Sequence, residues 1–327
     1  MNGELAIQTF GLAKSYRAAR VLAGVDLRVP QGSVYALLGG NGAGKTTIVR
    51  ILATLSRPDA GQITVAGFDV LRDRHKVRRA ISLTGQYSAL DEALTGEQNL
   101  RMMGSLSRLP RPAARARAAE LLERFALTAA ARRPVSTYSG GMRRRLDLAA
   151  TLVARPRVIF LDEPTTGLDL PSRRALWEII TELAAGGVTV FLTTQYLEEA
   201  DRLADTIAVL SGGQLVAEGS AAELKRRVAG QRLDLRLTTA AAFADLSSTL
   251  GGQVLHADQA TLTIGMPTDG SAAQVRALLD RLDPGRELVR DFAVRGASLD
   301  DVFLALTQNA ARPSNPVSTS DKETANA

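Results

Sequence analysis

Residues 39–46 read Gly-Gly-Asn-Gly-Ala-Gly-Lys-Thr and directly follow the apolar run at residues 34–38. The octet matches the pattern G-x-x-x-x-G-K-[ST], in which a glycine-rich turn lets backbone N–H groups surround phosphate oxygens. A strand before the turn and a helix after it bring the positive end of the helix dipole to the same point. The chain is therefore constrained to a fold with a strand, turn and helix that bind a nucleoside triphosphate.

This loop provides two kinds of contact. Lys45 is expected to reach the β and γ phosphates, and the Thr46 hydroxyl is expected to ligate Mg²⁺. The helix is expected to begin near Lys45 and to end at about Leu55. The residues expected to contact the nucleotide here are Gly39, Gly40, Asn41, Gly42, Ala43, Gly44, Lys45, Thr46 and Thr47.

The pattern of strands and helices around the loop indicates the fold class. Short β-type runs dominate residues 5–38, and a helical pattern rich in Ala, Leu and Arg occupies residues 95–154. Parallel-sheet signals return at residues 158–161, 188–192 and 206–210. This order predicts an α/β phosphate-loop fold with a β layer, a parallel sheet core and a helical insert.

A second pattern begins near residue 231. It runs in the order strand 232–237, helix 240–250, strands 253–256 and 261–265, helix 272–282 and strand 287–294, followed by a capped amphipathic helix at 298–306. Residues 311–327 are polar and rich in Pro, Ser and Thr. We therefore predict a nucleotide-binding domain at 1–230 with a helical subdomain at about 95–154, a small α+β domain at 231–310, and a disordered tail at 311–327.

Composition excludes several classes of function. The absence of cysteine excludes disulfides and thiol chemistry, and two isolated histidines, His75 and His256, leave no plausible zinc site. No window approaches the ~18 consecutive apolar residues of a membrane span, and the N-terminus lacks the pattern of a signal peptide. We expect a cytosolic chain. The net charge of +6 comes from scattered clusters such as Arg143-Arg144-Arg145, which we interpret as solvated surface rather than a nucleic-acid site.

A second motif, which carries two acidic residues, completes the expected site. Residues 158–161 form an apolar strand that ends in the adjacent carboxylates Asp162 and Glu163. This is a Walker B element: Asp162 is expected to hold Mg²⁺ through water, and Glu163 to polarise the attacking water as general base. Together with the phosphate loop it predicts hydrolysis of the nucleotide.

Between these two motifs lies Tyr138-Ser139-Gly140-Gly141-Met142. It resembles the Leu-Ser-Gly-Gly-Gln signature of the ATP-binding-cassette superfamily, with Tyr138 and Met142 replacing the outer residues. The resemblance implies that Ser139, Gly140 and Gly141 cap the γ-phosphate of ATP held by the opposite subunit. The active form would then be a head-to-tail homodimer with two composite sites.

Three further positions match the family's motifs in order, and two others depart from them. The resemblance places Tyr16 against adenine, Gln86 in the glutamine loop that contacts Mg²⁺ or water and faces the membrane partner, and Asp169 in the loop that crosses the dimer interface. Gln195 stands where most cassettes carry a histidine, and it can donate a hydrogen bond but cannot become cationic. We expect Gln195 to act as a neutral γ-phosphate sensor, while Gly40, which stands where proline is frequent, should matter little.

The resemblance narrows further through three stretches, at residues 83–86, 193–201 and 298–307. They are similar to the daunorubicin/doxorubicin-resistance subfamily, and the likeness covers the chain to about Thr307. It implies an ATPase subunit that binds ATP and Mg²⁺, pairs with a separate polytopic permease of the type-2 exporter class, and drives drug or antibiotic export from the cytoplasmic face of the membrane. The C-terminal domain would regulate or stabilise that assembly.

Two alternatives stay open at this point. The nearer one is an ATPase subunit of a lipid, polysaccharide or peptide exporter. The other is a soluble cassette ATPase acting on DNA or ribosomes, which the basic pI of 9.9 permits. A single phosphate loop without sustained heptads favours the transporter interpretation, with no nucleic-acid partner.

Overall fold

The protein is described from a computed structural model that covers residues 4–17, 19–85, 89–228, 231–296 and 298–303. Its central sheet has five parallel strands and one antiparallel edge strand, β10. In spatial order the strands are β10 (Gln214–Gly219), β9 (Thr206–Ser211), β3 (Val34–Leu38), β8 (Thr189–Thr194), β7 (Val158–Asp162) and β6 (Ile81–Thr84). Strands β3, β7 and β8 are buried along their whole length, which explains why apolar residues dominate their sequences.

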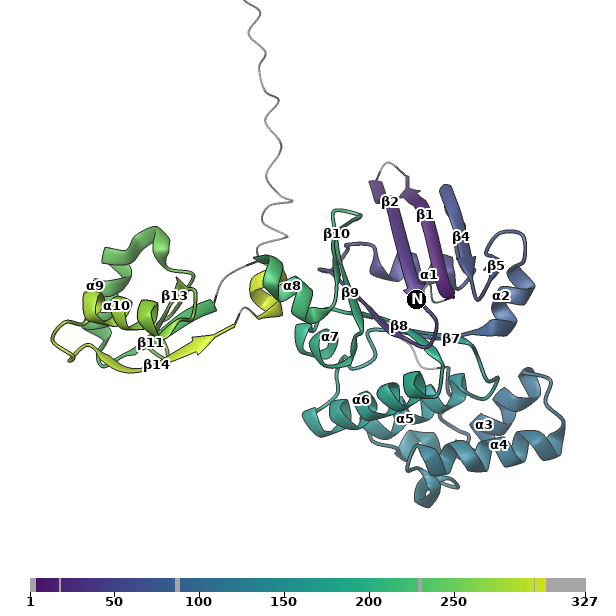
Figure 1. Cartoon of the computed structure of the whole chain (residues 1–327). Helices are drawn as coiled ribbons and strands as arrows, with labels where there is room; N and C mark the ends of the chain where they lie inside the picture. Colours follow the sequence, from purple (N-terminus) through teal and green to yellow (C-terminus); the bar gives the residue numbers. More distant parts are fainter. Residues whose placement is uncertain (1–3, 18, 86–88, 229–230, 297, 304–327) are drawn as a thin grey trace, which may run out of the picture.

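A second, antiparallel sheet covers one side of the core (Figure 1). Its strands, in spatial order, are β2 (Ala19–Pro30), β1 (Leu5–Tyr16), β4 (Ala60–Val65) and β5 (Phe68–Asp69). Helix α1 (Lys45–Leu52) shares one buried cluster with this sheet and with β3. The phosphate-loop helix is therefore packed between two sheets, and the predicted α/β fold with a β layer is confirmed.

The other side of the central sheet carries the helices. They are α3 (Gly96–Leu106), α4 (Arg111–Arg124), α5 (Gly140–Thr151), α6 (Leu170–Ala185) and α7 (Leu197–Leu203), with 3-10 turns at Thr128–Ala130 and Val135–Thr137. Thr95 and Gln98 form a reciprocal capping box that starts α3. Apolar residues of these helices pack against the sheet in a second buried cluster. The predicted helical insert is thus present.

A small antiparallel sheet follows helix α8 (Ala221–Val228). The sheet and its two helices are formed, in chain order, by β11 (Gln231–Leu237), α9 (Ala240–Leu250), β12 (His256–Asp258), β13 (Thr263–Thr268), α10 (Ala272–Leu282) and β14 (Val289–Arg295). This is the predicted β-α-β-β-α-β order. The strands lie in the order β12, β13, β11, β14, over their own buried cluster. Strand β14 forms one edge of this sheet.

The chain then returns to the nucleotide-binding part. Helical residues 299–303 lie beside α8 in Figure 1, and Leu299 and Val302 belong to the same buried cluster as Leu224 of α8. The Ser298 hydroxyl and the Asp301 carboxylate cap this helix reciprocally. This segment therefore packs away from the core of the small sheet. The domain boundaries at 230 and 310 stay a prediction, and residues 311–327 lie outside the described residues.

Several local predictions were wrong. The sequence did not predict α2 (Arg74–Ala80), β5 or β10, and α1 ends at Leu52 because Thr54 adopts a left-handed conformation at φ 64. The strand predicted at 253–256 begins only at His256, because Gly251 ends α9 with a positive φ and a 3-10 turn occupies Gly251–Gln253. These elements are short, and tertiary contacts rather than local pattern determine them.

The interpretation of Arg143, Arg144 and Arg145 as solvated surface was also wrong. All three donate hydrogen bonds to backbone carbonyls and are only partly exposed. His75 and His256 are exposed, as expected. Within the described residues, none of the helices combines the length and apolar content that crossing a bilayer requires.

Candidate nucleotide-binding site

The phosphate loop leaves the central sheet at the end of β3 and needs glycine at two points. A Cβ atom on Gly39 would lie 2.7 Å from the carbonyl oxygen of Leu210. Gly44 has φ +109, and a Cβ atom there would lie 2.8 Å from Leu22 Cδ2. At Gly40 the space is open, which agrees with the expectation that proline or glycine there matters little.

The loop encloses a small polar cavity of about 200 Å³. Its lining consists of Val21, Gly40, Asn41, Gly42, Ala43, Gly44, Lys45, Thr46, Thr47 and Glu163. Eight of the nine loop residues expected to contact nucleotide therefore border one cavity, together with the expected base. The ninth, Gly39, lies just before them at the end of β3.

Lys45 is the first residue of α1 and its side chain is only 5% exposed. The ammonium donates to the carbonyl oxygens of Gly39 at 2.7 Å and Gly40 at 3.2 Å, and it lies 3.7 Å from Glu163 Oε1. A buried ammonium at a helix N-terminus concentrates positive charge at the cavity wall. This arrangement suits a polyphosphate anion.

Asp162 lies at the carboxyl end of β7 and is buried. Its Oδ1 accepts hydrogen bonds from Thr193 of β8 at 2.5 Å and from Thr46 of α1 at 3.3 Å. A carboxylate and a hydroxyl at this distance offer the hard oxygen ligands that Mg²⁺ prefers. The donor set therefore fits the magnesium ion expected from the sequence.

Thr193 contacts both acids of the site, and the sequence analysis missed it. Its hydroxyl donates to Asp162, and both its carbonyl and its hydroxyl oxygen accept the Glu163 N–H, at 3.1 and 3.2 Å. The parallel register pairs Asp162 with Thr193 directly. Two adjacent threonines at the end of an apolar strand were the available signal.

Glu163 follows β7 with φ 50, a left-handed conformation that costs a non-glycine residue roughly 1 kcal/mol or more. The Glu163 carboxylate borders the cavity, and the Glu163 side chain is 16% exposed. The backbone turn thus directs this carboxylate toward the loop while Asp162 stays inside the sheet. The two adjacent acids have different surroundings, which allows them different roles.

The Ser139 segment does not reach this cavity. Ser139 caps α5 by accepting a hydrogen bond from the Met142 N–H at 3.2 Å, and Ser139 and Gly140 are exposed. Tyr138 is buried instead, and its hydroxyl donates to the carbonyl oxygen of Ala130 at 2.7 Å. The tyrosine that replaces leucine in the motif therefore anchors the segment within the helical part.

Comparison with known proteins identifies the family. The family profile described as ABC transporter matches residues 22–166. The daunorubicin/doxorubicin resistance ATP-binding protein DrrA of Streptomyces peucetius is 49% identical over 309 residues, covering 94% of this chain and 93% of that protein. The chain belongs to the ABC transporter family. It is an ATPase of that family, as the phosphate loop and the Walker B element predicted.

Two further comparisons agree with this assignment. The Nod factor export ATP-binding protein I of Ralstonia nicotianae is 35% identical, covering 91% of this chain and 92% of that protein. A solved structure described as the ATP binding subunit of an ABC transporter is 29% identical with a TM-score of 0.62, covering 68% of this chain and 93% of that chain. The predicted resemblance to the resistance subfamily of ABC proteins is confirmed.

Neither Gln195 nor Tyr16 lines the cavity. Gln195 is exposed just after β8, and the neighbouring Thr194 pairs with Leu38, the residue before the phosphate loop. Tyr16 is 46% exposed at the end of β1, with the Lys14 ammonium 5.4 Å from its ring centroid. Gln86 lies outside the described residues. Gln195 therefore follows the strand next to β3 at the carboxyl end of the sheet, and the expected roles of Gln195 and Tyr16 stay predictions.

Asp169 caps α6 by accepting a hydrogen bond from the Ser172 N–H at 3.1 Å. Hydrogen bonds from Ser172 lower the pKa of Asp169 below its ordinary value. Ser172 also abuts Gly141, where an added Cβ would lie 2.3 Å from Ser172 Oγ. The two segments expected at a dimer interface therefore contact each other on one exposed face.

Arg144 links three motifs of the cassette, a role that the sequence analysis missed. Its guanidinium donates to the carbonyl oxygens of Pro164 at 2.7 Å and Gly85 at 3.3 Å, and it pairs with Asp147. Burial lowers the pKa of Arg144, and the nearby carboxylates oppose that shift. The helix of the Ser139 segment is thus tied to the residue before Gln86 and to the loop after Glu163.

Proposed function

We propose that this ABC ATPase powers an exporter that moves a drug or antibiotic across the membrane through a separate permease. The observation that carries the proposal is that Lys45, Thr46 and Glu163 line one cavity, with Asp162 bonded to the Thr46 hydroxyl. The resistance proteins named above support the class of substrate.

ATP is bound at the phosphate loop in this proposal. Backbone N–H groups of residues 39–44 and the start of α1 surround the phosphates, and Lys45 exchanges its carbonyl partners for phosphate oxygens. Thr47 completes the loop contacts, and Tyr16 stacks on adenine. Thr46, Asp162 and Gln86 hold Mg²⁺, which neutralises charge on the phosphates when it is bound.

Glu163 acts as the general base. Its carboxylate faces the cavity from the loop side, where it can orient a water molecule and accept its proton. Gln195, at the neighbouring strand end, donates an amide N–H to the γ-phosphate as a neutral sensor. The catalytic residues in this proposal are Lys45, Glu163 and Gln195.

The site is completed by a second subunit. Ser139 and Gly140 are exposed and lie outside the cavity of their own chain, while Asp169 lies on the same face. A head-to-tail homodimer brings Ser139, Gly140 and Gly141 of one subunit to the γ-phosphate held by the other, with Asp169 at the interface. Closure on ATP and reopening after hydrolysis then drive transport.

The partner is a polytopic permease of the type-2 exporter class. The chain associates with the cytoplasmic face of the membrane through that permease, and the Gln86 loop forms part of the contact. Arg144 connects this loop to the Ser139 helix, which supports transmission of closure toward the membrane. The small C-terminal domain at 231–310 stabilises the assembly.

A second candidate is export of another kind of molecule. The Nod factor export protein, at 35% identity over nearly the whole chain, favours this alternative over an ATPase acting on DNA or ribosomes. Greater identity to the resistance proteins favours drug export. The cargo contacts the permease, so the test must recover that partner.

The experiment is to trap the Glu163→Gln variant with ATP in membranes of its native cells and to identify the copurifying protein by mass spectrometry. The variant is expected to bind ATP, to hydrolyse it roughly 10²–10⁴-fold more slowly, and to recover a polytopic permease that is then tested for drug export. Full-rate hydrolysis would exclude Glu163 as the base. Recovery of ribosomes or DNA from the soluble fraction would overturn the exporter proposal.

A further inference from the structure

Strand β14 is an unusually open edge of the small sheet. Among the described residues it pairs with β11 on one side only, and every residue after Val289 is exposed. Phe292 is 51% exposed and Val294 39%. A seven-residue edge strand with exposed apolar side chains is a template for pairing with another chain.

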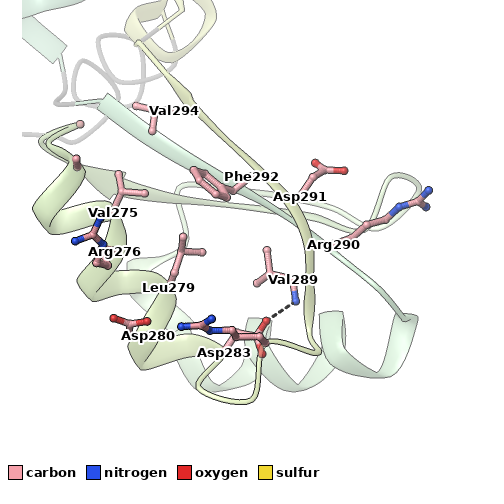
Figure 2. A pocket seen from close by; sticks show the side chains of 13 residues that line it. Val275, Arg276, Leu279, Asp280, Asp283, Val289, Arg290, Asp291, Phe292 and Val294 are labelled. Atoms are coloured by element: carbon pink, nitrogen blue, oxygen red, sulfur yellow. Dashed lines mark hydrogen bonds between the residues drawn. The ribbon is translucent and has the colours of Figure 1, made fainter.

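A groove of about 840 Å³ lies beside this edge, between α10 and β14 (Figure 2). Its apolar lining includes Val275 and Leu279 of α10 and Phe292 and Val294 of β14. Figure 2 shows the Asp283 carboxylate bonded to the Val289 N–H, and Asp283 also accepts from the N–H groups of Glu287 and Leu288. These bonds fix the turn between helix and strand, so the groove is held open by the fold.

We propose that a second copy of this chain docks here, with the two β14 strands antiparallel and related by a two-fold axis at Ala293. Residues opposite each other on paired strands share a face of the sheet. Phe292 and Val294 pair with the buried Leu235 and Leu233 of β11, so they face the helix side. Asp291 and Arg295, at the alternate positions of β14, face the opposite side of the sheet, away from α9 and α10.

The sequence of β14 is self-complementary in this register. Phe292 lies opposite Val294 of the second copy, and Asp291 lies opposite Arg295 of the second copy, each pair occurring twice. A shift by one residue would set apolar side chains against polar ones. A shift by two residues would keep the faces and lose the opposite-charge pairs. Arg295 is 67% exposed while bound to Asp234 at 3.0 Å, so its guanidinium fork can bridge both carboxylates.

The chain's own terminal residues are a poorer occupant. Residues 307–327 contain one large apolar side chain, Val317, together with Pro313 and Pro316, which cannot donate to a strand ladder. They cannot reproduce the alternation of apolar and opposite-charge partners that β14 offers to itself. A second copy supplies both.

This association is distinct from the nucleotide-dependent dimer proposed above. It uses the small sheet rather than the phosphate loop and the Ser139 segment, and it requires no ATP. It would hold two ATPase subunits together while their nucleotide sites are open. Failure of one dimer leaves the other testable.

The absence of cysteine in the chain allows a direct test by single substitutions in the full-length protein. Antiparallel partners lie about 4.5–5.5 Å apart at Cα, within disulfide reach, so Ala293→Cys is expected to form a disulfide-linked dimer under mild oxidation. Lys45→Ala is added and nucleotide omitted, so that the ATP dimer makes no contribution. Ala257→Cys, exposed on the opposite edge strand β12, is the matched control and should stay monomeric.

A second experiment reverses the charges of the proposed Asp291–Arg295 pairs. Arg295→Asp is expected to weaken dimerisation roughly tenfold in sedimentation experiments by setting carboxylates opposite each other, and adding Asp291→Arg should restore it. A merely unfolded variant would not be rescued. A monomeric chain without nucleotide, equal cross-linking at Ala257, or cross-linking of Ala293→Cys to the permease alone would overturn the proposal.

Discussion

The groups that meet the phosphates and the groups expected to close over them differ sharply in burial. Lys45 and Asp162 are 5% and 4% exposed, and they lie at the start of α1 and at the end of β7, two elements that contribute to the buried core. Ser139 and Asp169 are exposed on the helical side, where each caps a helix. One half of the site is therefore set by the fold of a single chain, and the other half requires a partner surface.

Mixing two inactive variants gives the largest expected effect. Lys45→Ala removes the phosphate cation, and Ser139→Asp keeps the helix cap but places a carboxylate toward the γ-phosphate. Each is expected to lose ATP turnover about 100-fold, while a mixture should regain at least about tenfold over either alone, because mixed dimers contain one intact composite site. Phosphate release per chain is the measurement. If mixing restores nothing, the exposed half does not act across a dimer.

The next prediction concerns Gln195, which is exposed like Ser139 but follows a buried strand of the central sheet. Gln195→Ala is expected to lower turnover about tenfold with little change in ATP affinity, because it removes one hydrogen bond to the reacting phosphate. Gln195→His should retain activity and acquire a pH dependence near the ordinary histidine pKa of about 6.5. Exposed Glu198 provides the control substitution, Glu198→Gln. Unchanged turnover in Gln195→Ala would exclude the sensor role.

The smallest expected effect is on the pH dependence of stability, and it concerns Glu199, a buried acid in α7. Glu199 is fully buried and accepts a hydrogen bond from Trp177 Nε1 at 3.2 Å. Burial raises the pKa of its carboxyl above the ordinary value. At a pH between the pKa of Glu199 in the unfolded chain and its higher pKa in the folded chain, the folded chain keeps a proton that the unfolded chain releases. The free energy of unfolding therefore falls as the pH rises through this range.

Glu199→Gln removes this titration and keeps the acceptor for Trp177. Its melting temperature is expected to exceed that of the natural chain by a few degrees at about pH 8, with the difference shrinking toward about pH 4. Thermal melts across that range measure it, and exposed Glu198→Gln should show no such trend. A variant that is less stable at high pH would mean that the carboxylate form is the one the fold needs.

The strongly periodic and glycine-marked parts of the chain were predictable. The phosphate loop after β3, the helices α7, α9 and α10, and the succession of strands and helices along residues 231–295 follow from local sequence. The Asp162–Thr193 contact did not follow, because it depends on the register of two strands separated by a helix. The three arginines after Met142 were misread as solvated, since only the folded chain brings carbonyl oxygens to them.

The sequence by itself determined that this chain binds nucleotide through a phosphate loop and carries the motifs of an ABC ATPase, because a glycine-rich turn, a lysine and a helix start are set by adjacent residues. Tertiary structure decided which of those motifs meet. Tertiary packing brings Thr46 and Glu163 to one cavity and Asp162 into contact with Thr46, while Ser139 and Asp169 lie exposed outside that cavity. The order of strands in the small sheet places β14 at an edge. This order is a tertiary property, because packing across the whole chain rather than sequence proximity decides which strands are neighbours.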